Sequence, residues 1–122
     1  GKYFNFSTSG QWMWDEINVS IPPGVRSYPL IEKIHAAAIK ATEADAKMAE
    51  AEWKRATHEE GLPQFRATPS VDMRPAGPGV DIVVRYITRA GVRLETRNKL
   101  FEIVVELLRA ERESPQESQA TA

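Results

Sequence analysis

The clearest hydrophobic pattern lies between residues 80 and 109, where two periods follow one another. Every second residue from Val80 to Tyr86 is apolar, which is typical of a strand with one buried face. After Arg89-Ala90-Gly91 the apolar residues return at helical spacing. They are Leu94, Leu100, Phe101, Val104, Leu107 and Leu108, with Arg97 in the same phase. The opposite side is charged: Glu95, Lys99, Glu102, Glu106 and Arg109. The pattern predicts a strand over 80–88 and an amphipathic helix from about Val92 to Glu111.

The inward phases of this strand and this helix meet in one layer. We therefore expect one core to contain Ile82, Val84, Leu100, Phe101 and Val104.

A second, longer helix is predicted from Ser27, a suitable N-cap, to about His58. Its distal half, 43–60, is rich in alanine and charge, and only Met48 and Trp53 are large apolar residues able to anchor it. A helix of about 30 residues spans about 45 Å, which is longer than a domain of this size is wide. We expect the distal half either to project from the domain or to break.

Three further strands complete the pattern. Alternation predicts strands over 3–7 and 14–21, and a third over 65–74 that Pro69 makes an edge or bulged strand. A turn at 75–79 joins the third strand to 80–88. The core order β-α-β-β-α predicts an α+β fold, ferredoxin-like without its last strand, with two helices on one face of an antiparallel sheet. The strand at 3–7 precedes this core and is free to belong to another sheet.

Composition places the chain among ordinary globular proteins. It has 122 residues, a net charge of −1 and no cysteine, which indicates one domain and excludes disulfides and thiol chemistry. No run approaches the roughly 20 apolar residues of a membrane span, so we expect a soluble chain. The polar stretch 114–122 predicts a disordered tail. The chain opens inside a strand without an initiator methionine, and we interpret it as a piece of a longer protein.

Residues able to carry chemistry are few. His35 and His58 lie too far apart on one helix to share a metal ion, which favours structural roles for both. The carboxylate neighbours Asp15-Glu16 and 59–60 point apart on a strand and on a helix, so neither forms an acid–base pair. Neither a nucleophile motif nor a phosphate loop is present. We expect no enzymatic activity, no catalytic residue, no cofactor and no metal.

Five basic residues gather in one stretch: Arg85, Arg89, Arg93, Arg97 and Lys99. Ferredoxin-like sheets that bind RNA require exposed stacking aromatics on a central strand, and 80–86 has only Tyr86. We therefore expect no nucleic acid partner. Arg85 and Arg89 are predicted to form ion pairs with acidic residues within or between subunits.

Trp12 and Trp14 stand at alternate positions near the chain start. Two readings stay open, a place in the core or an interface patch covered by a neighbouring domain or subunit. Taking Trp12, Trp14 and Trp53 as the main exposed apolar residues, we expect this chain to be a monomer or a weak dimer in dilute solution, because stable interfaces bury roughly 1,200–2,000 Å².

Several segments carry a family resemblance. D-I-V-V-R-Y-I-T-R-A at 81–90, E-T-R-N-K-L-F at 95–101, W-D-E-I at 14–17 and N-F-S at 5–7 resemble the C-terminal cytoplasmic part of small-conductance mechanosensitive ion channels. The resemblance implies that 1–10 is the end of the preceding β-domain and 11–113 is the α+β cytoplasmic domain. It also implies a parent in the inner membrane whose cytoplasmic part forms a homoheptameric chamber that sieves solutes. The role of this domain is then structural and concerned with permeation.

The chain departs from the family in two places. The family closes its chamber with a final strand from each subunit, and 114–122 has no strand pattern. The helix over 43–60 is longer than the family leads us to expect and would reshape the portals. The alternative hypothesis is a soluble ferredoxin-like domain that binds a small molecule or a protein partner.

Overall fold

The computed structural model describes residues 2–4, 12–56 and 66–113. The elements in chain order are β1 (Lys2–Phe4), β2 (Trp12–Ile21), α1 (Ser27–Ala56), β3 (Ser70–Ala76), β4 (Gly79–Arg89), a 3-10 turn (Ala90–Val92) and α2 (Arg93–Arg112). The two helices and the strands β2 and β4 lie where the hydrophobic periods predict them.

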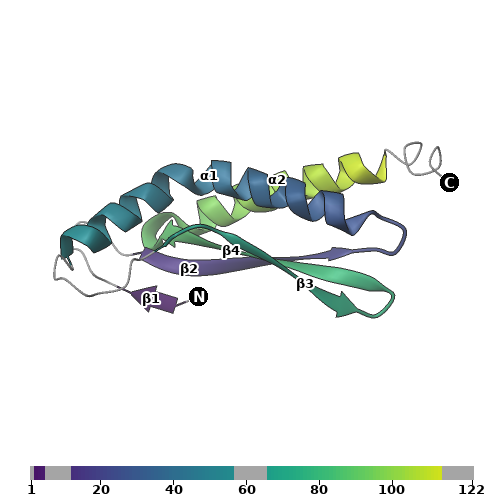
Figure 1. The fold of residues 1–122 in the computed structure, drawn as a ribbon, viewed down its shortest axis with the longest axis horizontal. Coiled ribbons are helices and arrows are strands. Elements are labelled where there is room, and N and C mark those ends of the chain that lie inside the picture. The colour runs from purple at the N-terminus through teal and green to yellow at the C-terminus, as the bar shows by residue number, and fades with distance from the viewer. Residues whose placement is uncertain (1, 5–11, 57–65, 114–122) are drawn as a thin grey trace.

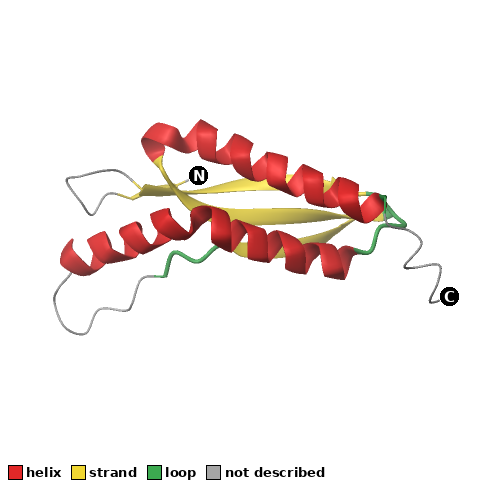
Figure 2. Ribbon diagram, turned by 90° about the horizontal axis from the view of Figure 1, so that it is seen from above, coloured by secondary structure: helices red, strands yellow, loops and turns green. Residues whose placement is uncertain are grey.

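The strands form one antiparallel sheet in the order β1-β2-β4-β3, and both helices cover the same face of it (Figure 1). Figure 2 shows the helices side by side above the sheet, with α2 on the side where the N-terminus lies. Three long strands and two helices give the predicted α+β fold, and their order matches a ferredoxin-like β-α-β-β-α arrangement without its last strand.

The first strand is shorter than predicted and joins this sheet. β1 pairs with β2 through Lys2 opposite Trp14 and Phe4 opposite Trp12. It therefore lies at the β2 edge of the same sheet instead of in a separate one. The rest of the predicted strand, 5–7, lies outside the described residues.

The strand predicted over 65–74 begins later, at Ser70. Pro69 has no N–H to donate to a ladder, and its carbonyl oxygen lies 3.2 Å from Nε2 of His35 on α1. Ala67 is fully buried, so the segment entering β3 packs inward before it pairs. The turn to β4 is also tighter than predicted, because pairing continues to Ala76 and Gly79.

The main core lies between the sheet and the two helices. Its buried residues are Ile17, Val19, Ile21, Leu30, Ile34, Ala38, Ile82, Val84, Tyr86, Leu100 and Val104. Four of the five predicted core residues belong to this set. The fifth prediction was wrong, because Phe101 is 46% exposed. Successive helical residues turn by about 100°, so a face centred on Leu100 and Val104 leaves Phe101 on its outer flank.

The distal half of α1 neither projects freely nor breaks within the described residues. It continues to Ala56 and packs on a second cluster through its small residues. That cluster consists of Trp12, Ala46, Ala49, Ala67 and Ile87. Met48, one of the two predicted anchors, is 46% exposed. The alanines anchor this half because their short side chains let the helix approach the Trp12 ring.

Candidate functional site

A buried carboxylate lies where β2, β4 and the first turns of α2 meet. Asp15 is only 2% exposed and belongs to the face of the sheet that the helices cover. The Tyr86 hydroxyl donates a hydrogen bond to its Oδ2 at 3.1 Å, and Nε of Arg93 donates to the same oxygen at 3.1 Å. Nη1 of Arg97 lies 3.5 Å from Oδ1. Asp15, Tyr86, Arg93 and Arg97 are called the Asp15 cluster below.

The local sequence explains how these four residues meet. Asp15 and Tyr86 are direct cross-strand partners in the β2–β4 ladder, so their side chains leave the sheet on the same face. Arg93 and Arg97 are one helical turn apart at the start of α2, so both guanidinium groups reach the same point. The turn at 90–92 is short and directs α2 back across β2. Arg97 also donates from Nη1 to the carbonyl oxygen of Glu16 at 2.7 Å.

The protonation states of this cluster follow from its contacts. Burial by itself raises the pKa of Asp15, but hydrogen bonds from Arg93, the Glu16 backbone and Tyr86, with the charge of Arg93, outweigh it. The pKa of Asp15 therefore lies below its ordinary value. Burial, and then the negative charge of Asp15, raises the pKa of the Tyr86 hydroxyl above its ordinary value. Near neutral pH, Asp15 is an anion that Tyr86 and the two arginines stabilise.

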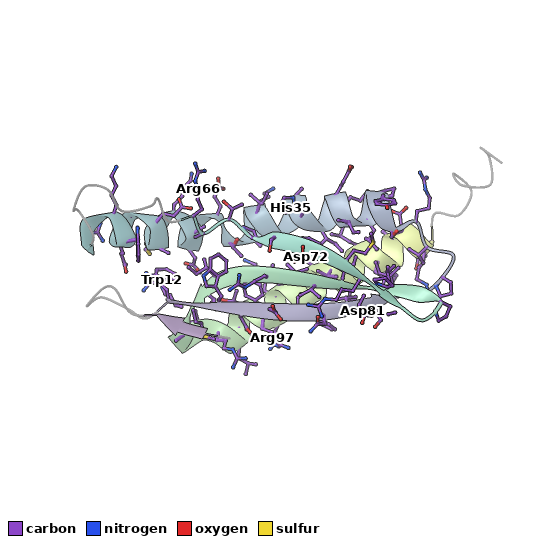
Figure 3. The ribbon with its side chains drawn as sticks, turned by 60° about the horizontal axis from the view of Figure 1, so that its bottom comes forward. Trp12, His35, Arg66, Asp72, Asp81 and Arg97 are labelled. Atoms are coloured by element: carbon purple, nitrogen blue, oxygen red, sulfur yellow. The ribbon has the colours of Figure 1, made fainter. Side chains whose placement is uncertain are left out.

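A second polar group lies at the same end of the sheet. Nε1 of Trp12 donates to Oε1 of the buried Glu52 on α1 at 2.8 Å. The guanidinium of Arg89 stacks over the Trp12 ring at 4.7 Å, and that of Arg85 over the Trp14 ring at 4.8 Å. Figure 3 shows Trp12 on the α1 side of β2 and Arg97 on the side away from α1.

These contacts decide several predictions about the tryptophans and arginines. Trp12 is fully buried and belongs to the core, whereas Trp14 is half-buried. Within the described part of the chain, Arg85 and Arg89 stack on tryptophan rings instead of forming the predicted ion pairs. Ion pairs of these arginines between subunits stay a prediction. Two other arginines of the same basic stretch, Arg93 and Arg97, do pair with a carboxylate, that of Asp15.

The remaining candidate residues are not brought together. Asp15 and Glu16 point to opposite faces, as predicted, with Asp15 buried and Glu16 exposed. His35 contacts the Pro69 carbonyl, which fits the structural role expected of it. His58 and the carboxylates at 59–60 lie outside the described residues. Among residues 12–56 and 66–113, no three His, Asp or Glu side chains converge on a point where a metal ion would sit.

Sequence reasoning missed the Asp15 cluster, although a signal was present. Asp15 falls in the same alternating phase as Ile17 and Val19, so the alternation itself places a carboxylate on the buried face. A buried carboxylate needs hydrogen-bond donors or positive charges around it. The nearby basic stretch contains Arg93 and Arg97, which are one helical turn apart and can reach the same carboxylate. Because Tyr86 on β4 and Arg93 and Arg97 on α2 all contact the Asp15 carboxylate on β2, the cluster holds the start of α2 against the sheet.

Comparisons of this chain with known protein families, with curated proteins and with solved structures find no match. Neither α1 nor α2, over the residues described, combines the length and the apolar composition that crossing a membrane requires.

Proposed function

We propose that this chain is the C-terminal cytoplasmic domain of a small-conductance mechanosensitive ion channel. Its role is structural: it forms part of the wall of a homoheptameric chamber below a tension-gated pore in the inner membrane. The chamber sieves solutes through its side portals, and the domain catalyses no reaction.

One observation carries this proposal. The segments on which the resemblance rests, 14–17, 81–90 and 95–101, are far apart in the sequence but lie in contact on β2, β4 and α2. Asp15 of the first segment bonds Tyr86 of the second and Arg97 of the third. If the similarity of these separate segments arose by chance, there would be no reason for their residues to contact one another in one buried cluster.

The cluster also suits a wall that must resist deformation. Asp15 ties the start of α2 to β2, and Thr88 on β4 donates to Thr96 on α2 at 2.9 Å. Both contacts hold the helix against the sheet at the end of the domain where β1 enters. A stiff domain transmits and withstands force better than one whose helices slide.

A protein-binding module is the second candidate, and one feature favours it over small-molecule binding. A surface hollow of about 590 Å³ runs along α2 and is lined by residues of that helix alone, including Phe101, Val105 and Leu107. A hollow with one wall cannot enclose a small ligand, whereas pockets for small ligands bury most of the ligand surface. This surface fits another protein.

The reading frame that precedes Lys2 separates the two candidates. The channel proposal predicts hydrophobic spans of about 20 residues each, followed by a β-rich segment that leads directly into this chain. A parent gene that encodes no such span would contradict the proposal and leave the protein-binding module.

A further inference from the structure

The guanidinium group of Arg89, at the end of β4, contacts two groups that carry no charge. It stacks over the Trp12 ring at 4.7 Å, and its Nη2 donates to the Sδ atom of Met48 on α1. Nε1 of Trp12 in turn donates to Oε1 of Glu52 at 2.8 Å, and Glu52 lies one helical turn after Met48. These four residues, called the Met48 group below, connect the distal half of α1 to the end of β4.

The thioether of Met48 is a poor acceptor for this donor. Sulfur in a thioether accepts hydrogen bonds only weakly, whereas arginine forms its strongest contacts with negatively charged oxygen atoms. Among the residues that the structure describes, the ion pairs of arginine involve Arg93, Arg97 and Arg109, and not Arg89. Arg89 is therefore directed at a group that becomes a much better acceptor when it gains an oxygen atom.

Met48 is also the most exposed of the three methionines. Its side chain is 46% exposed, compared with 37% for Met73 and 4% for Met13. Oxidation of a methionine requires access of the oxidant to the sulfur, so the folded chain presents Met48 and Met73 and protects Met13. Within residues 12–56 and 66–113, the sulfur of Met48 is the one that an arginine contacts.

We propose that Met48 is a site of reversible oxidation by hydrogen peroxide, and that its sulfoxide fastens α1 to β4 through Arg89. A lone pair of the sulfur attacks one oxygen of the peroxide, and the O–O bond breaks. The sulfur loses two electrons, and the departing hydroxide takes the proton from the transferred oxygen and leaves as water. The sulfoxide oxygen carries partial negative charge and accepts a charge-assisted hydrogen bond from Nη2 of Arg89.

Oxidation at this position stabilises the fold, which is the opposite of its usual effect. A sulfoxide in a core is a polar group that disrupts the packing around it. Met48 lies at the surface, where the added oxygen has room, and its donor is already in place. The distal half of α1 otherwise packs through the small residues Ala46 and Ala49, so a stronger hydrogen bond adds to few other contacts there. This inference does not depend on the proposed channel function.

Peptide mass mapping after treatment with dilute hydrogen peroxide identifies the oxidised residues. The folded chain should gain one oxygen at Met48 and at Met73 about tenfold or more faster than at Met13, whose side chain is buried. The two methionine sulfoxide reductases, one for each sulfoxide epimer, should then remove the oxygen from Met48. Oxidation of Met48 no faster than that of Met13, or a Met48 sulfoxide that neither reductase reduces, would overturn the proposal.

Thermal melts of two matched variants test the role of Arg89. Met73→Leu leaves Met48 as the exposed methionine, Met48→Leu leaves Met73, and leucine conserves the side-chain volume in both. Each variant is compared with its own reduced form. Oxidation should raise the melting temperature of Met73→Leu by about 2–5 °C and should not raise that of Met48→Leu.

The control for the donor adds Arg89→Leu to Met73→Leu. This variant keeps the Met48 sulfur but removes the guanidinium group, so oxidation should no longer raise its melting temperature. An unchanged or lower melting temperature after oxidation of Met73→Leu would contradict the proposal. A rise that persists in the variant without Arg89 would contradict it as well.

Discussion

Replacement of Asp15 by asparagine tests how much the Asp15 cluster stabilises the packing of α2 on the sheet. Asparagine keeps the size of the side chain but removes the charge that Arg93 and Arg97 neutralise. Breaking a fully buried ion pair costs roughly 3–5 kcal/mol. Here the arginine side chains are 49% and 40% exposed, so water takes up part of their charge when the anion is lost. We expect Asp15→Asn to lower the free energy of unfolding by roughly 2–3 kcal/mol at pH 7.

Urea unfolding, followed by tryptophan fluorescence, measures this free energy. The matched control is Glu16→Gln, which removes the neighbouring charge from an exposed position and should change stability by less than about 0.5 kcal/mol. Equal losses of stability from both substitutions would refute the reasoning, because the buried Asp15 and the exposed Glu16 would then contribute equally to the free energy of unfolding.

The pH dependence of the free energy of unfolding tests the role of the Asp15 charge independently. The pKa of Asp15 is lower in the folded chain than in the unfolded one, so its contribution is present above the unfolded pKa, about 3.9, and is lost as the pH falls through the folded value. The difference between wild type and Asp15→Asn should be full at pH 7 and shrink below about pH 4. A difference that stays constant down to pH 2 would show that the charge of Asp15 contributes nothing.

Two further predictions concern packing. Leu100→Ala should cost about 2–5 kcal/mol because Leu100 is buried, whereas Phe101→Ala should cost less than about 1 kcal/mol in the monomer, as thermal melts will show. Comparable losses would mean that the phase of α2 is different. Gly79→Ala should cost about 1–3 kcal/mol, because a Cβ there would collide with the Ile21 carbonyl oxygen. Gly91→Ala meets open space and should be close to neutral, so an equal loss at both glycines would contradict the close approach of the backbone at Gly79.

Much of the fold could be predicted because the periods are strong where one face of an element is buried. β4 and α2 follow the alternation of 80–88 and the helical spacing of 94–108 closely. The exposed Phe101 could not be distinguished from the buried Leu100, because neighbours on a helix differ by only about 100° and both are large and apolar. Only the contact of α2 with β2, set in part by Arg97, fixes which side faces inward.

The polar contacts were harder to predict than the elements. Which arginines would bind a carboxylate depended on the β2–β4 register, which places Tyr86 opposite Asp15 and Arg89 opposite Trp12. A single shift of register would have exchanged the two faces of the strand. The packing of the distal half of α1 was missed for a related reason, because Ala46 and Ala49 become anchors only when Trp12 lies beneath them.

Recording from patches of membrane tests the channel proposal most directly. The full parent reading frame would be expressed in bacterial cells that lack their own mechanosensitive channels, and suction would be applied to excised patches. The account predicts a conductance that opens with membrane tension, and expects it to weaken or become unstable when Asp15→Asn loosens the chamber wall. Patches that hold the expressed protein but show no tension-gated current would contradict it.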